Sequence, residues 1–330
     1  MFINQFSMET DQNPSSPRFR GIQALAAVAG SLFVLRLAVA FIMVPEAVAP
    51  WASLFLTVLF IIAPIVGLFF AANEKWSPIR ATSLVVIGVL FHLGLTVLIR
   101  QLKLEGVAAV VLTALAQTGL LLWCAGLGAL VSSLLKDKNI LLPIALVLAA
   151  IDIFVVTSPI GTVKQVLQKQ PEILEKVAYS VPKAAIEGQQ QGVQVNIGAY
   201  VGPADLFFLM MFFVAIWKFG LRAKETLRWM SVALVGYLLI VLFFGDVRFG
   251  EVSLAALPAL VPIGAVILLV NRKEFTLSRD ELQSTIAVGI IGLCLASYGL
   301  YSGVTATKAK PVEPSQKAAS AKPQAPQATP

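Results

Sequence analysis

Long runs of apolar residues, separated by short polar segments, dominate the chain. An α-helix needs about 20 consecutive apolar residues to cross roughly 30 Å of hydrocarbon. The pattern predicts nine membrane-spanning helices, at residues 21–44, 50–72, 81–100, 106–134, 139–158, 199–218, 229–245, 251–270 and 284–303. We therefore expect an all-α polytopic membrane protein.

The composition supports the same class. Of the 330 residues, 58% are hydrophobic and only 13% are charged, whereas a soluble domain of this size needs more charged side chains to cover its surface. The net charge of +7 falls mostly in predicted loops and the C-terminal segment. There it reports orientation in the lipid bilayer, so we expect no nucleic-acid partner. Cys124 and Cys294 lie far apart in apolar runs and indicate no disulfide framework.

The chain divides into segments of different composition. They are a polar N-terminus at 1–20, a transmembrane bundle at 21–138, a second bundle at 139–303 containing a long loop at 159–198, and a tail at 304–330. The tail is rich in Ala, Pro, Gln and Lys and cannot form a core, so we expect it to be disordered. The first apolar run is too long for the core of a signal peptide, which favours a retained first span.

The distribution of Lys and Arg predicts the orientation. With the N-terminus in the cytoplasm, thirteen of these residues fall in the cytoplasmic segments and three in the short outer loops. Positive residues accumulate on the cytoplasmic side of membrane proteins. We therefore expect a multi-pass protein of the cell membrane, with its N-terminus in the cytoplasm and its C-terminus outside.

Two acidic residues, Asp152 and Asp205, lie at membrane depth. Asp152 comes seven residues before Pro159, near the end of its predicted span, and Asp205 comes seven residues after Gly198, near the start of the next. Because these helices run antiparallel, both carboxylates are expected roughly 10 Å below the same membrane face. Buried acids of this kind mark a catalytic site, an ion or proton pathway, or structural contacts between helices.

A third feature lies at the same predicted depth. The sequence Pro258-Ala259-Leu260 begins the eighth predicted span, and Pro262 follows closely. Neither proline donates a backbone hydrogen bond, so the helix is loosened there. Irregular backbone is tolerated in a membrane only where protein or a water-filled cavity surrounds it. The pattern thus predicts an irregular backbone segment at about the depth of the two aspartates.

Together, these three features resemble the presenilin and signal peptide peptidase family of intramembrane aspartyl proteases. The family pattern is Tyr-Asp, then Gly-x-Gly-Asp, then Pro-Ala-Leu. The corresponding residues here are Ile151-Asp152, Gly202-Pro203-Ala204-Asp205 and Pro258-Ala259-Leu260. The resemblance covers roughly residues 139–270, and it implies a presenilin-like fold.

The resemblance also implies an activity. Asp152 and Asp205 would form the catalytic dyad of an intramembrane endopeptidase, supported by the residues beside them in the three motifs. Two adjacent carboxylates come to share one proton, so that one activates water and the other protonates the peptide. The expected substrates are single-span membrane proteins or signal peptides. We expect no metal and no cofactor.

Two departures from the family pattern keep other functions open. Ile151 stands where the family has tyrosine, and Ala204 stands where it has the glycine before the second aspartate. A proton- or cation-coupled transporter would use the same acids, although no internal repeat typical of many transporters is evident. A catalytically inactive presenilin-like protein is the third alternative.

The segment before Asp205 has the pattern of a strand. Val193, Val195 and Ile197 alternate with polar residues. An edge strand at this place would hold an unwound substrate by strand addition, as the resemblance implies, whereas the alternative is an ordinary extended linker. Predicted spans also contain two other polar residues, Arg36 and the single histidine His92. We interpret both as packing or hydrogen-bonding residues.

Overall fold

The structure, a computed structural model, describes residues 21–158, 176–188, 193–244, 248–249, 252–253 and 258–305. The predicted polar N-terminus lies outside these residues, and so does the predicted disordered tail from residue 306. Residues 304–305, which were assigned to the tail, end the final helix. Much of the predicted loop at 159–198 also lies outside the described residues.

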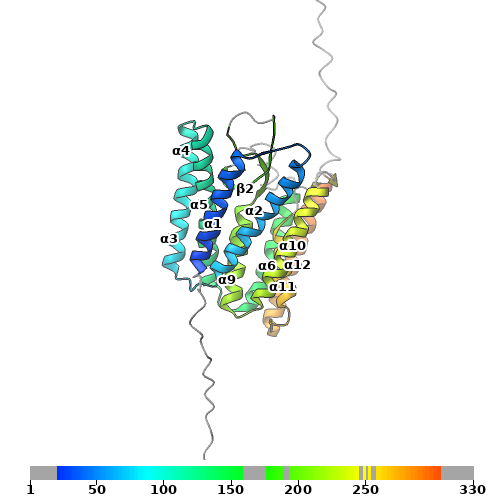
Figure 1. Ribbon diagram of the computed structural model, residues 1–330. Coiled ribbons are helices and arrows are strands. Elements are labelled where there is room, and N and C mark those ends of the chain that lie inside the picture. The colour runs from blue at the N-terminus through cyan, green and yellow to red at the C-terminus, as the bar shows by residue number, and fades with distance from the viewer. Residues whose placement is uncertain are drawn as a thin grey trace, which may run out of the picture.

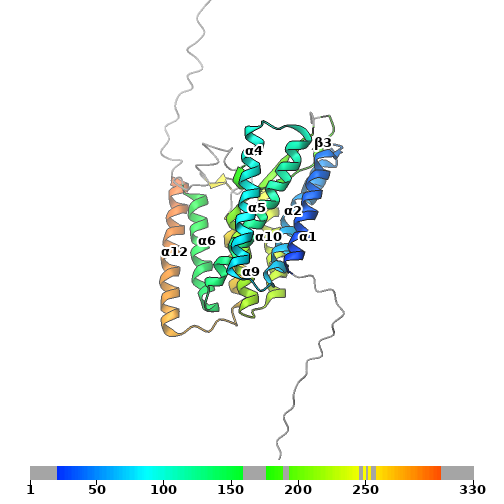
Figure 2. The same ribbon diagram turned by 90° about the vertical axis from the view of Figure 1, so that its left-hand side faces the viewer.

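The described chain is a bundle of roughly parallel and antiparallel helices, with short strands at one end (Figures 1 and 2). The helices are α1 (Gly21–Phe41), α2 (Ala49–Ala72), α3 (Pro78–Val89), α4 (Leu95–Gln101), α5 (Gly106–Leu134), α6 (Leu141–Thr157), α9 (Pro203–Lys218), α10 (Ala223–Phe244), α11 (Leu260–Asn271) and α12 (Arg279–Thr305). A π-helical turn, η1 (Leu90–Gly94), joins α3 to α4, and a 3₁₀ turn, η2 (Lys138–Ile140), precedes α6.

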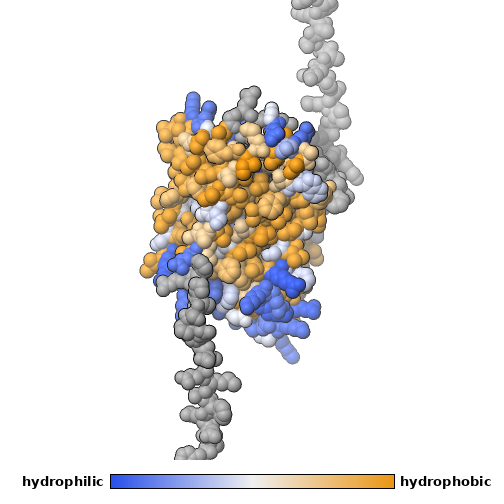
Figure 3. Space-filling view, in the orientation of Figure 1, coloured by the Kyte–Doolittle hydropathy of each residue, from blue (hydrophilic) through white to orange (hydrophobic). Residues whose placement is uncertain are grey.

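Six helices in the described part of the chain are long and apolar enough to cross a membrane: α1, α2, the continuous α3–α4, α5, α6 with η2, and α12. Figure 3 shows a broad hydrophobic band across the molecule, with hydrophilic residues gathered towards its two ends. These helices confirm six of the nine predicted spans and the class of multi-pass α-helical membrane protein. Of the remaining helices, α9 and α11 are shorter, with 16 and 12 residues, and α10 has 22.

Two predicted span boundaries are wrong. The span predicted at 199–218 begins as strand, and α9 starts at Pro203, because proline fixes φ for the first helical position and needs no hydrogen bond there. The span predicted at 251–270 contains strand residues at 252–253, and α11 starts at Leu260. Pro262 is accommodated in the first turn, where backbone N–H groups have no intrahelical acceptor.

Short strands form three two-stranded sheets. β2 (Tyr179–Pro182) pairs antiparallel with β4 (Ile197–Val201), β1 (Met43–Val44) pairs parallel with β3 (Ala185–Ile186), and β5 (Arg248–Phe249) pairs antiparallel with β6 (Val252–Ser253). The all-α expectation therefore omitted these strands, apart from the strand pattern noted at 193–197, which reaches the first residue of β4. β2 is buried along its whole length, and it reaches between the helices (Figure 1).

Glycines allow close contact between helices around α5. A Cβ atom on Gly128 of α5 would lie 2.5 Å from the Phe207 carbonyl oxygen of α9, and one on Gly119 would lie 2.7 Å from the His92 backbone nitrogen. Small residues at such contacts let helix backbones approach in a membrane, where packing rather than water exclusion holds helices together. Gly128 therefore fixes the position of α9, which carries Asp205.

We predict that Gly128→Ala lowers thermal stability by several degrees, because the methyl group can fit only if α9 moves away from α5. A displacement of this kind costs roughly 1–3 kcal/mol. Gly30→Ala is the matched control: Gly30 also lies within a helix, but nothing approaches its position within 4 Å, so the change is neutral or stabilising. Thermal unfolding of the purified variants in detergent checks this, and equal midpoints for both variants would contradict it.

Candidate functional site

Asp152 lies on α6, five residues before the end of the helix. Its Oδ2 accepts a hydrogen bond of 2.7 Å from the backbone N–H of Leu260. Leu260 is the first residue of α11, and the N–H groups of a first turn have no partner within their own helix. The Asp152 carboxylate therefore satisfies the N-terminus of α11, whose dipole favours a negative charge.

Asp205 lies in the first turn of α9, also near a helix N-terminus. Its backbone N–H donates to the Gly202 carbonyl over 3.1 Å. A Cβ atom on Gly202 would lie 3.1 Å from Asp205 Oδ2, so glycine leaves room for the carboxylate. Cys124 of α5 donates from its Sγ to the Pro203 carbonyl over 3.4 Å. These contacts fix the turn that carries Asp205.

The two carboxylates come close enough to interact electrostatically, although 53 residues of chain separate them. Asp205 lines a cavity of about 110 Å³ enclosed by α2, β2, β4, α9, α10 and α11. Ala259 also lines this cavity, and the adjacent Leu260 bonds to Asp152. The structure thus places Asp152 near both Asp205 and the Pro-Ala-Leu segment.

The two departures from the family pattern lie away from this cavity. Ala204 is exposed, and its side chain lies outside the cavity lining. Ile151 is 43% exposed and likewise does not line the cavity. Neither substitution therefore places a methyl or butyl group in the space beside Asp205.

The predicted strand residues lie elsewhere. β4 begins at Ile197, so Val193 and Val195 precede the strand. All three line a second, larger cavity beside Arg36 instead of the Asp205 cavity. The prediction placed the strand four residues too early, because alternation of apolar residues continues through 193–197 while pairing with β2 holds only Ile197–Val201.

Three tyrosines line the Asp205 cavity and were missed from the sequence: Tyr179 on β2, Tyr200 on β4 and Tyr237 on α10. Tyr237 interacts electrostatically with both Asp205 and Asp152. Its sequence context, "LVGYLLIVLFF", makes it the only polar side chain in an apolar run. That isolation is the one signal that could have identified it.

Polar side chains from the membrane-spanning helices hold β2 in place. On α5, Gln117 donates from Nε2 to the Ala178 carbonyl over 3.2 Å, and its Oε1 accepts from the Ser180 N–H over 3.0 Å. On η1, His92 accepts at Nδ1 from Trp123 Nε1 over 3.1 Å. The ring proton is therefore on Nε2, which donates to the Lys176 carbonyl over 3.0 Å. Gln117 therefore bonds to β2 as a neighbouring strand would.

Arg36 of α1 completes this support. Its guanidinium donates to both the hydroxyl and the carbonyl of Ser180. Its Cζ lies 4.8 Å from the Phe60 ring centroid and 4.7 Å from that of Tyr179. Burial raises the pKa of Tyr179, with the Arg36 charge acting in the opposite direction, so this tyrosine is neutral at pH 7. Arg36 thus makes structural contacts with β2, and His92 makes one with Lys176 in the segment that leads into it.

The groups that line the Asp205 cavity are carboxylate, phenol and apolar side chains. Among the described residues, no group of three or more His, Cys, Asp and Glu side chains is placed to hold a metal ion. The chemistry that the arrangement offers is proton transfer between carboxylates and a bound molecule. No family model, curated protein sequence or solved structure matches the chain.

Proposed function

We propose that the protein is an intramembrane aspartyl endopeptidase with a presenilin-like fold. The observation that carries the proposal is the electrostatic interaction of Asp152 with Asp205, which lines a cavity, together with the bond from the Leu260 N–H to Asp152. In this proposal α9, α10 and α11 cross the bilayer too, giving nine spans. The N-terminus is cytoplasmic, the C-terminus lies outside, and the protein resides in the cell membrane.

The proposed chemistry is hydrolysis of a peptide bond by the carboxylate pair. Two neighbouring carboxyl groups cannot both ionise cheaply, because their negative charges repel. The pair therefore holds one proton between its members. The ionised carboxylate takes a proton from water, whose oxygen attacks the peptide carbonyl carbon. The other, protonated carboxyl donates its proton to the carbonyl oxygen, which gives a gem-diol. As the C–N bond breaks, the carboxyl that took the water proton protonates the leaving nitrogen, and the gem-diol returns a proton to the other carboxylate. Leu260 N–H and the start of α11 stabilise negative charge on Asp152.

A substrate helix has to unwind before its backbone reaches the carboxylates, and β4 offers an edge for the unwound segment. β4 pairs with β2 on one side and ends at Val201, four residues before Asp205. An extended peptide adds to such an edge through main-chain hydrogen bonds. The proposed substrates are single-span membrane proteins or signal peptides, because each supplies one apolar helix with polar flanks.

The deciding experiment offers a fluorescent single-span substrate to the purified protein in detergent and in liposomes. The proposal expects cleavage by the wild-type chain and none by Asp152→Asn or Asp205→Asn. Asp280→Asn is the control, because Asp280 is exposed in the first turn of α12. No cleavage by the folded wild type, combined with uptake driven by a proton or cation gradient in the same liposomes, would favour the transporter instead.

Tyr237 gives a further test of the site. We predict that Tyr237→Phe lowers kcat about tenfold or more. The tyrosine lines the Asp205 cavity, where we expect its hydroxyl to donate to the charge that develops during the reaction, and a hydrogen bond to a charged group contributes roughly 1.5–3 kcal/mol. The fold is retained, since the ring remains in the cavity wall. Tyr298→Phe is the control, because Tyr298 is 57% exposed on α12. A Tyr237→Phe variant with unchanged kcat would show that this hydroxyl takes no part in the reaction.

A further inference from the structure

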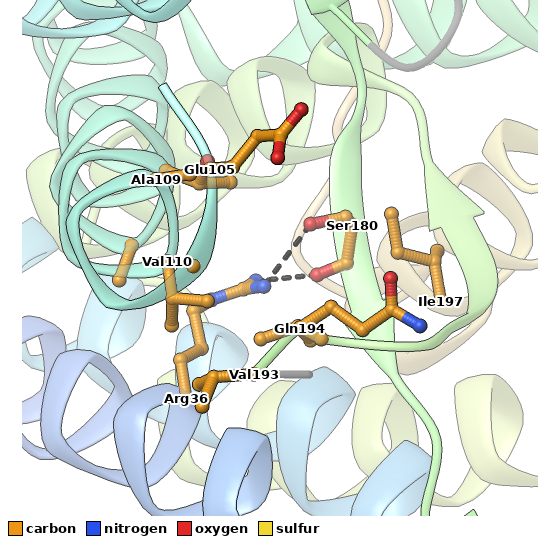
Figure 4. Close-up of a pocket in the computed structure, with 12 residues that line it drawn as sticks. Arg36, Glu105, Ala109, Val110, Ser180, Val193, Gln194 and Ile197 are labelled. Atoms are coloured by element: carbon orange, nitrogen blue, oxygen red, sulfur yellow. Dashed lines mark hydrogen bonds between the residues drawn. The ribbon is translucent and has the colours of Figure 1, made fainter. Parts of the chain in front are cut away.

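A second cavity, of about 780 Å³, opens at the strand-bearing end of the bundle. Its walls come from α1, the first two turns of α5, β2 and the segment 193–197 that leads into and begins β4. Figure 4 shows Arg36 and Ser180 facing each other across part of this space, with Glu105 on the α5 side. None of its lining residues lines the Asp205 cavity.

The wall of this cavity carries a buried positive charge. Arg36 is 4% exposed, and among the described residues no carboxylate pairs with it. A guanidinium has five N–H donors, and two bonds go to Ser180. Arg36 also lines the cavity, so its other N–H donors are available to a ligand bound there. Burying a charge is costly unless an opposite charge meets it.

A negative charge lies at the mouth of the same cavity. Glu105 is exposed, immediately before the first residue of α5, and it lines the cavity without forming an ion pair with Arg36. The Glu105 carboxylate lies apart from the Arg36 guanidinium, with no bond drawn between them (Figure 4). A ligand that spans the two therefore needs an anionic group at its inner end and a cationic group at its outer end.

The cavity lies close to the membrane surface, within reach of the headgroup region of a bilayer. Arg36 lies five residues before the end of α1, which is about 7.5 Å along the helix. Trp51, two residues into α2 at the same end of the bundle, is 72% exposed, as is typical of residues at a membrane surface. Deeper in the cavity the lining is apolar, with Val110 and Ala114 of α5.

We propose that this cavity binds the headgroup of a zwitterionic phospholipid with a primary ammonium, of the ethanolamine type. The phosphate accepts hydrogen bonds from Arg36, the ammonium pairs with Glu105, and the glycerol region lies along Val110 and Ala114. An anionic headgroup without an ammonium would meet repulsion from Glu105. The site does not depend on the aspartates being catalytic.

The test is native mass spectrometry of the delipidated full-length protein in detergent. The protein is titrated separately with phosphatidylethanolamine, phosphatidylglycerol and phosphatidylcholine. We expect phosphatidylethanolamine to bind about tenfold more tightly than the other two. Glu105→Gln should abolish this preference, and Ala109→Leu, which fills the cavity wall, should weaken binding of all three about tenfold. Glu46→Gln, which changes an exposed acid at the same end of the bundle, should change nothing.

The variants avoid Arg36 itself, because its loss would also release β2. Equal binding of the ethanolamine and glycerol lipids by the wild type would overturn the headgroup assignment, as would an unchanged preference in Glu105→Gln. Undiminished lipid binding by Ala109→Leu would show that the lipid sits elsewhere. Displacement of the lipid by free phosphoethanolamine at equal concentration would assign the cavity to a soluble ligand and overturn the lipid proposal.

Discussion

Replacing either Asp152 or Asp205 with asparagine should abolish cleavage while leaving the protein folded. Asparagine cannot hold or transfer the proton that the pair shares, and each acid–base group contributes roughly 10²–10⁴-fold to a rate. Because the two act as one unit, either single change should cost as much as both together. The measurement is the initial rate of substrate cleavage by each single variant and by the double variant.

Folding of the Asp152 variant can be checked independently. Asparagine retains an oxygen that accepts from the Leu260 N–H, so Asp152→Asn should unfold close to the wild-type temperature. Asp152→Leu removes the acceptor and leaves a buried N–H unpaired, at about 1–3 kcal/mol. Comparing the two separates loss of chemistry from loss of structure. Cleavage that survives in either asparagine variant would contradict the dyad.

The long spans were predictable because their signal is local. Each of the six confirmed spans is a long run of mostly apolar residues, and a helix is the way such a run satisfies its own backbone in hydrocarbon. Asp152 and Asp205 were identifiable for a related reason, since each stands out against an apolar background. Asp152 lies near the end of one predicted helix and Asp205 near the start of the next. Because these helices run antiparallel, the two aspartates could be expected to meet.

The strand boundaries were not predictable in the same way. Nothing within 193–201 distinguishes the part that pairs from the part that does not, because the pairing partner β2 lies at Tyr179–Pro182. The start of α11 at Leu260 likewise depends on an acceptor from Asp152, more than a hundred residues earlier. Tyr237 joins the site only through the packing of α10. These features belong to tertiary structure and leave no local pattern.

The same reasoning explains three polar residues within the spans. Arg36, His92 and Gln117 are scattered along the sequence and form no motif, yet each bonds to the backbone or side chain of residues 176–180. A strand inside a helical membrane protein has backbone groups that hydrocarbon cannot satisfy. β4 bonds to one edge of β2, Arg36 and Gln117 bond to Ser180 within β2, and His92 bonds to Lys176, which precedes the strand. They therefore position the wall that carries Tyr179 beside the Asp205 cavity.

Gln117→Leu should consequently destabilise the protein and impair the site together. The change keeps a similar volume but leaves the Ala178 carbonyl and the Ser180 N–H without partners, which costs about 2–6 kcal/mol and lowers the unfolding midpoint by roughly 5–10 °C. Displacement of β2 and β4 should reduce cleavage about 100-fold even below that midpoint. Thr118→Val is the matched control, because the Thr118 hydroxyl bonds only to Ala114 within its own helix. Equal stability and activity in the two variants would show that Gln117 does not support β2.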